Sequence, residues 1–207
     1  MKDLADTRNG SSSRQLTPGM IVCPACGGPL KPDSKWCPTC NFTGGDSIRF
    51  FPDSPPPLLP ILDAAEIFTE ADTRKIERVR EAIGKRFPQF RWRVCSVNLP
   101  QETRLSLFGF WLLNASPLAE NETSDERTWT VLLLINANTG QAAVILGYAA
   151  EPFLSDDDWK NALSSMASDW QAGNPSKAVG CFFKNTRILL DQAAARFGSR
   201  RTDGKIR

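Results

Sequence analysis

The sequence predicts a three-layer α/β/α sandwich with a small mixed sheet, preceded by an N-terminal zinc-ribbon module. Three observations support this fold class. Two CxxC pairs lie near the N-terminus, the strand-like segments further on carry apolar residues at both alternating positions, and helical patterns flank those segments. A strand that is apolar on both faces needs cover on both, and helices provide that cover in a sandwich.

The 207 residues have room for one main domain and a small appendage. Residues 1–20 are rich in small polar residues and lack an apolar period, which is typical of disorder. The expected organisation is a disordered N-terminus at 1–20, a zinc ribbon at 21–45, a Pro-rich linker or docked lead-in at 46–60, the α/β/α domain at 61–198 and a basic disordered tail at 199–207.

The N-terminal module carries the pattern of a metal site. Two CxxC pairs, separated by ten residues, contribute Cys23, Cys26, Cys37 and Cys40. Two residues between cysteines let one tight turn direct both sulfurs at one cation, and two such turns complete a tetrahedral S₄ site. Gly27 and Asn41 follow the second cysteines, where a positive φ is expected. The prediction is a structural Zn²⁺ with no open position, and iron is the alternative that an S₄ site can hold.

Around twenty residues cannot bury a core, so the metal is expected to supply the folding free energy of the ribbon. Its candidate partner contacts are Trp36, Lys31 and Lys35, and an exposed ribbon without such a role is an alternative of equal weight. In the segment that follows, docking on the main domain is favoured over a free tether. A free linker would not expose four large apolar side chains, and this one carries Phe50, Phe51, Leu58 and Leu59.

The first elements of the main domain are a helix and a strand. Thr69 and Asp72 have the spacing of a capping pair, and the apolar residues that follow recur at helical spacing up to Phe87, before Pro88. Residues 91–99 are apolar on both faces and predict a buried strand, in which Cys95 is a small buried hydrophobe.

The clearest β signal is TWTVLLLINANTGQAAVILGYA, where Asn138-Thr139-Gly140 separates two apolar runs. It predicts a hairpin buried on both sides. Two helices are expected to close the chain. One is capped by Ser155 and buries a stripe from Trp159 to Trp170, and the other runs from Pro175 to Phe197 and ends at Gly198.

Residues 100–127 change from apolar to acidic, and their latter half is expected to be an exposed loop. The apolar half is expected to dock onto the core, with a binding patch as the alternative. The side chains concerned are Phe108, Phe110, Trp111 and Leu112.

Residues 61–197 resemble the TPM-domain family. The resemblance lies in the opening ILDAAEIFTEAD, in Trp111 of FGFWLLN, in the strand VLLLI and in GYAAEPFLSDDDW. It implies an α/β/α sandwich, in agreement with the residue pattern. Some family members bind a divalent cation, and others have reported phosphatase activity. The resemblance therefore implies a Ca²⁺ or Mg²⁺ site that would polarise a phosphoryl oxygen and orient water, formed by Asp63, Glu151, Asp156, Asp157 and Asp158.

The same carboxylates have a structural interpretation of at least equal weight. Helix capping and the helix dipole explain Asp156 to Asp158, and the turn before the first helix explains Asp63. The chain also lacks family glycines, both in the segment 147–151 and after Trp111, which weakens a ligand site there. No histidine is present, so a Ser–His or Cys–His nucleophile pair is excluded.

Composition narrows the function. The basic tail is short and contains glycine, so nucleic-acid binding is the least favoured reading. No apolar run approaches the roughly 18 residues that span a membrane, and the polar N-terminus lacks a secretory signal, so a cytoplasmic location is expected. CxxC cysteines in a reducing compartment favour metal over disulfides.

Three functions are therefore considered. The first is a cytosolic zinc-ribbon/TPM-like adaptor that binds a protein partner or assists an assembly, without catalysis. The second is a divalent-metal-dependent phosphatase that uses the acidic set. The third is a nucleic-acid-binding zinc-ribbon protein. The oligomeric state is left open.

Overall fold

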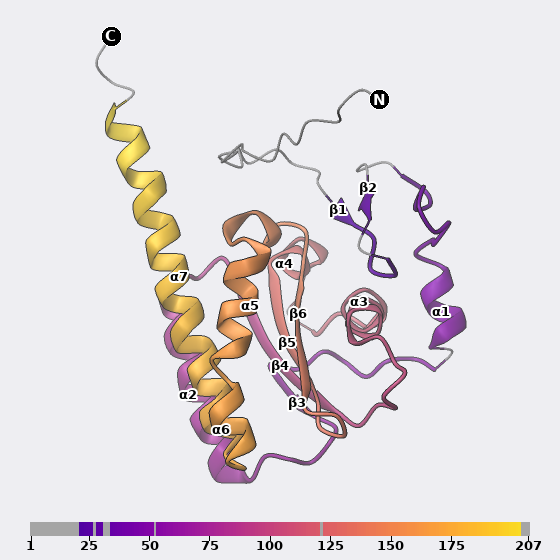
Figure 1. The fold of residues 1–207 in the computed structure, drawn as a ribbon, viewed down its shortest axis with the longest axis horizontal. Helices are drawn as coiled ribbons and strands as arrows, with labels where there is room; N and C mark the ends of the chain where they lie inside the picture. The colour runs from indigo at the N-terminus through magenta and orange to yellow at the C-terminus, as the bar shows by residue number, and fades with distance from the viewer. Residues whose placement is uncertain (1–20, 27, 31–33, 52, 121, 204–207) are drawn as a thin grey trace, which may run out of the picture.

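The computed structural model describes residues 21–203 except 27, 31–33, 52 and 121. A four-stranded mixed sheet lies between helices on both of its faces, which confirms the predicted three-layer sandwich (Figure 1). Its strands are β3 (Ile61–Asp63), β4 (Arg91–Val97), β5 (Thr130–Asn136) and β6 (Gln141–Leu146). The predicted disorder of residues 1–20 lies outside the described residues.

The sheet has the order β3-β4-β5-β6, with β3, β4 and β5 parallel and β6 antiparallel to β5. The last two strands form the predicted hairpin, and Gly140 takes a positive φ of 67° in its turn. All of β5 is buried, as expected. By contrast, β6 is partly exposed, because it lies at the edge of the described sheet.

Four helices cover one face of the sheet: α2 (Glu70–Arg86), α5 (Asp156–Ser164), α6 (Ala167–Gln171) and α7 (Pro175–Asp203). The alternating strand positions Trp92, Val94, Val131, Leu133 and Ile135 point to this side, where they form the larger core. The predicted cap of α2 is confirmed as a full capping box between Thr69 and Asp72. Arg86 pairs with Asp191 at 2.7 Å, which ties α2 to α7.

The opposite face is covered by α3 (Leu105–Ala115) and the lead-in to the domain. Trp111 and Leu112 are buried against Cys95, Leu132 and Leu134, so the expected docking of this apolar stretch is confirmed. Burial raises the pKa of the Cys95 thiol to about 12, with a smaller contribution from Asp63. That result agrees with the role of a small buried hydrophobe.

Helix α3 approaches β6 closely because residue 109 is glycine. A Cβ atom at Gly109 would lie 2.3 Å from Cγ1 of Ile145 and 3.1 Å from Cδ2 of Leu134. Any larger residue would push the helix away from the sheet.

Three expected boundaries are wrong. The exposed loop before the hairpin contains the short helix α4 (Ser124–Thr128), which a capping box of Thr123 and Glu126 begins. The helix expected after Ser155 is broken into α5 and α6. Helix α7 continues past Gly198 to Asp203, because an interior glycine costs a helix only about 1 kcal/mol. Residues 199–203 therefore belong to a helix, while the rest of the basic tail lies outside the described residues.

The N-terminal module contains the two-residue strands β1 (Ile21–Val22) and β2 (Pro29–Leu30), which pair antiparallel. Helix α1 (Asp46–Phe50) follows. Leu58 is buried and Phe51 contacts Phe108 and Trp111, so the lead-in is docked. Phe50 and Leu59 remain exposed. Within the described part of the chain, no helix combines the length and the apolar character needed to cross a membrane.

Candidate metal centre and the adjoining groove

The four cysteines of the N-terminal module meet at one point. Sγ of Cys23 lies 3.7 Å from Sγ of Cys40, and Sγ of Cys26 lies 3.6 Å from Sγ of Cys37. All four sulfurs lie within 4.8 Å of one another. Zn–S bonds of about 2.3 Å in a tetrahedron separate neighbouring sulfurs by about 3.8 Å, whereas a disulfide needs about 2.05 Å. The cluster therefore has the dimensions of a metal site, and all four cysteines are free.

Backbone turns hold the sulfurs in place. The N–H of Gly28 donates to Sγ of Cys26, and the N–H of Thr39 donates to Sγ of Cys37, both at 3.4 Å. Asn41 has a φ of 59°, which confirms the expected positive φ in the second turn. Its counterpart Gly27 lies outside the described residues. N–H donors aimed at sulfur favour thiolates, the form that binds metal.

The thiols do not ionise independently. Burial acts to raise the pKa of Cys37, but hydrogen bonds from the backbone of Cys40 and Thr39 and from neighbouring thiols outweigh it and lower that pKa to about 6. A backbone hydrogen bond from Phe42 acts to lower the pKa of Cys40, but burial and the other three cysteines raise it to about 12. The first thiolate thus forms readily, and its negative charge disfavours ionisation of the other thiols. A divalent cation at the centre would favour the thiolate form of all four cysteines.

The module (the ribbon, residues 21–45) is docked on helix α3. The ring of Phe42 meets the ring of Phe110 edge to face, with centroids 6.2 Å apart. Arg104 donates a hydrogen bond to the carbonyl oxygen of Ala25, and Ser106 donates to that of Pro24 at 3.4 Å. The ribbon consequently lies on the face of the sheet opposite α7 (Figure 1).

A groove of about 530 Å³ opens between the ribbon and the sandwich. The ribbon, α3, the segment that includes α4, and the segment after β6 all line it. Three of its side chains are large, apolar and exposed: Trp36 at 58%, Tyr148 at 49% and Leu118 at 47%. Cys37 also lines the groove, so the metal site supports one of its walls.

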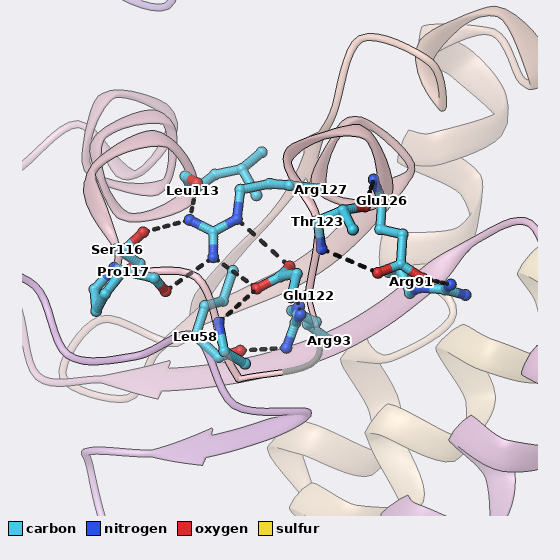
Figure 2. Close-up of polar contacts among 11 residues, drawn as sticks. Leu58, Arg91, Arg93, Leu113, Ser116, Pro117, Glu122, Thr123, Glu126 and Arg127 are labelled. Atoms are coloured by element: carbon cyan, nitrogen blue, oxygen red, sulfur yellow. Dashed lines mark hydrogen bonds and ion pairs between the residues drawn. The ribbon is translucent and has the colours of Figure 1, made fainter.

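A buried ion-pair network fixes the wall formed by α3 and α4 (Figure 2). Glu122 accepts from Nη2 of Arg93 and from Nη2 of Arg127, both at 2.7 Å, and these three side chains are only 6–12% exposed. Arg127 also donates to the carbonyl oxygens of Leu113, Ser116 and Pro117 at the end of α3. Burial acts to raise the pKa of Glu122, but the two guanidinium groups and a backbone N–H lower it.

A second carboxylate in the groove is not paired in this way. Glu151 lies in the 3₁₀ turn after β6 (Glu151–Phe153) and is half-buried. Among the described residues, it forms no hydrogen bond or ion pair. Burial, and secondarily the nearby Asp156, raise the pKa of Glu151 to about 7.

The acidic residues expected at one end of the sheet are divided: Asp156 lies near Glu151, but Asp63 lies at the opposite end. Strand pairing aligns Asp63 with Ser96 and Ser96 with Ile135 at one end, whereas Leu146, just before Glu151, pairs with Val131 at the other end. Asp63 accepts the N–H groups of Ile67 and Phe68 at 3.2 and 2.8 Å. It has the structural role of holding the turn before α2.

The aspartates of α5 also have local partners. Asp158 forms a capping box with Ser155, and Asp157 pairs with Lys160 at 3.2 Å. In the described parts of the chain, the cluster of three or more metal-ligating side chains that could hold one ion is the four cysteines.

Comparisons with known proteins add little to this geometry. No protein family and no curated protein matches the chain. Among solved structures, the N-terminal domain of a P. gingivalis protein, determined by solution NMR, is similar over 71% of this chain and 88% of that chain. The TM-score is 0.49 and the sequence identity is 14%. A similarity at this level indicates neither the fold nor the function of this chain, and both are described from its own geometry.

Several groove residues were not singled out from the sequence as site residues. Leu118, Tyr148 and Arg127 come from three segments that are separate in the chain, and no local spacing connects them. Trp36 and Glu151 were singled out, the first as a contact on the ribbon and the second as a cation ligand. The one available signal for Tyr148 was its position directly after a strand, as the only tyrosine of the sequence.

Proposed function

We propose that this protein is a zinc-stabilised protein-binding module in which the ribbon and the sandwich form a single binding surface. The observation that carries the proposal is the groove between them, into which three large apolar side chains project from separate segments. Half of the described large apolar side chains that are exposed line this groove. Exposed apolar side chains gathered in a concave site are typical of an interaction surface.

Zinc is the proposed metal. Four thiolates with neighbouring sulfurs 3.6–3.7 Å apart suit a tetrahedral Zn²⁺ with no open position, which gives the metal a structural role. Iron is the alternative for the same ligand set. The metal would hold both CxxC turns and, through them, the wall that contains Trp36.

The relation of the sandwich to the TPM-domain family remains a proposal, supported by the α/β/α architecture and by the capped helix after Asp63. A cytoplasmic location is likewise proposed, from the paired cysteines. The phosphatase and nucleic-acid alternatives gain no support from the geometry. The acidic set is divided between the two ends of the sheet, and the acidic side chain that lines the described groove, the half-buried Glu151, would repel phosphates when it is ionised.

Site-specific photo-crosslinking tests the binding function. A benzophenone amino acid replaces Leu118 in the groove of the full-length, zinc-loaded chain, and a matched variant carries it at Ile188 on α7, which is similarly exposed at 42%. Irradiation in a lysate of the source organism is expected to give discrete protein adducts from position 118. The same adducts are expected to be absent when the crosslinker is at position 188. The same adducts from both positions would contradict a groove-specific function.

A further inference from the structure

Glu151 is the one acidic side chain among the described residues that line the groove. It is half-buried beside the apolar Leu146 and the ring of Tyr148. A carboxylate in such a place loses hydration, and a cation or hydrogen-bond donor normally compensates it. The charged group that acts on Glu151 is instead Asp156, which has the same sign.

The cations that line the groove do not compensate Glu151. Arg127 directs its guanidinium at Glu122 and at the carbonyl oxygens of α3 (Figure 2). Lys35 lies on the ribbon side and forms no ion pair with Glu151. When Glu151 is ionised, the groove thus presents one negative charge that no cation among the described residues pairs with.

The surroundings of Glu151 suit a particular kind of cation. Tyr148 precedes it by three residues, and Trp36 and Phe110 line the same groove. Aromatic rings stabilise Lys and Arg side chains through their faces, and they also receive the methylene stem of these side chains. A compact hydrated metal ion would need several more oxygen ligands than one carboxylate provides.

We propose that the groove binds a peptide segment of a partner protein in which a Lys or Arg side chain stands beside a large apolar residue. Glu151 is the counter-ion of the basic side chain, and Trp36 and Leu118 contact the apolar one. The inference rests on the proposed function above and adds the chemistry of the partner to it. Charge complementarity at a desolvated position gives specificity, and the apolar contacts give affinity.

An array of synthetic hexapeptides tests the proposal. Its central residue is Lys, Arg, Gln or Glu, and its flanking residues are Leu, Phe or Ala. The probe is the fluorescently labelled full-length chain in its zinc-loaded form. Peptides with Lys or Arg beside Leu or Phe are expected to bind about tenfold more tightly than their Gln counterparts. Their affinity is also expected to fall as salt is raised.

Glu151→Gln and Asp157→Asn each remove one negative charge, so comparing them separates an effect of the groove from an effect of the net charge of the protein. Glu151→Gln is expected to remove the preference for basic peptides, and Glu151→Lys to transfer it to the Glu peptides. Asp157→Asn removes a carboxylate that is 87% exposed and does not line the groove, so it is expected to retain the full preference. Trp36→Ala is expected to weaken all apolar peptides while the charge preference remains.

Two results would overturn the inference: equal binding of basic and neutral peptides by the wild-type chain, or an unchanged preference in Glu151→Gln. If apolar peptides bind without charge preference and Trp36→Ala abolishes that binding, the proposed function stands and the inference about Glu151 falls. If no peptide binds, the inference also falls, and crosslinking from position 118 decides the proposed function independently.

Discussion

The rings of Phe42 in the ribbon and Phe110 in helix α3 meet edge to face at an interplanar angle of 74°. This contact joins the metal-binding module to the sandwich, together with the hydrogen bonds from Arg104 and Ser106. The ribbon is therefore part of a shared surface, since Cys37 and Phe110 line the same groove.

Phe110→Ala is expected to loosen the ribbon while the sandwich keeps its stability. An edge-to-face aromatic pair contributes about 0.5–1.5 kcal/mol beyond its buried area. Hydrogen exchange should show faster exchange at residues 36–43 and unchanged protection in β4 and β5. Phe50→Ala is the control, because the Phe50 ring is 62% exposed. Equal effects of the two variants would contradict a docking role for Phe110.

One Zn²⁺ per chain is expected by native mass spectrometry. Cys37→Ser should lose the metal and unfold the ribbon, because the metal supplies its folding free energy. The far-UV circular dichroism of the helices should persist, since the large core contains no residue of the ribbon. Cys181→Ser is the matched control, because Cys181 lies on α7 and donates to Asp169. Full metal content in Cys37→Ser would be the contrary result.

Glu122→Gln is expected to destabilise the fold by about 3–5 kcal/mol, because it leaves the buried Arg93 and Arg127 without a counter-charge. Chemical denaturation measures the loss. Glu70→Gln removes the carboxylate of a helix-surface pair that is 91% exposed on the Glu side, and it should change stability by less than about 0.5 kcal/mol. A comparable loss of stability in both variants would show that the buried network in Figure 2 stabilises the fold no more than an exposed ion pair does.

The stability contribution of Glu151 depends on pH in a direction that its environment fixes. Its pKa of about 7 in the folded chain exceeds its ordinary value of 4.5. Between pH 4.5 and 7 the Glu151 carboxyl is protonated more often in the folded chain than in the unfolded chain. The free energy of unfolding of the wild type therefore falls as the pH rises through this range, and Glu151 causes no further fall above about pH 7. The stability of Glu151→Gln relative to wild type should therefore increase from pH 4.5 to 7 and then level off. A constant difference across this range would contradict the raised pKa.

Gly109→Ala is expected to cost about 1–3 kcal/mol, because the new Cβ would overlap Ile145 on β6. Gly180→Ala is the matched substitution in a helix, since no atom lies within 4 Å of the Cβ that it would introduce. It should stabilise α7 by about 0.5–1 kcal/mol. Thermal unfolding of the two variants should move in opposite directions.

The layers of the fold could be predicted from local patterns. Helix α2, strands β4 and β5 and the hairpin turn at Gly140 follow from caps, apolar periods and turn residues that act within a few positions. The cysteine spacing similarly predicted a cluster whose sulfurs lie 3.6–3.7 Å apart. Each of these features is specified by residues that are close in sequence.

Helix α3 was missed as a helix because LSLFGFWLLNA is apolar on nearly every side and has no amphipathic period. Between the sheet and the ribbon, such a helix is covered in most directions. The pairing of Arg93 with Glu122 and the groove were missed for another reason. Their residues lie dozens of positions apart, and the fold alone brings them together.

The structural interpretation of Asp63 and Asp158 agrees with the hydrogen bonds that they form.

The late place of α7 among the elements of the sandwich has a consequence for biosynthesis. Val179, Phe182 and Phe183 complete the core that Ile76, Ile83 and Trp92 begin roughly one hundred residues earlier. A nascent chain on the ribosome carries that apolar surface uncovered until α7 has emerged, and domains generally fold as units. The sandwich is therefore expected to reach its native state only after α7 has emerged, and until then the uncovered apolar surface is open to aggregation.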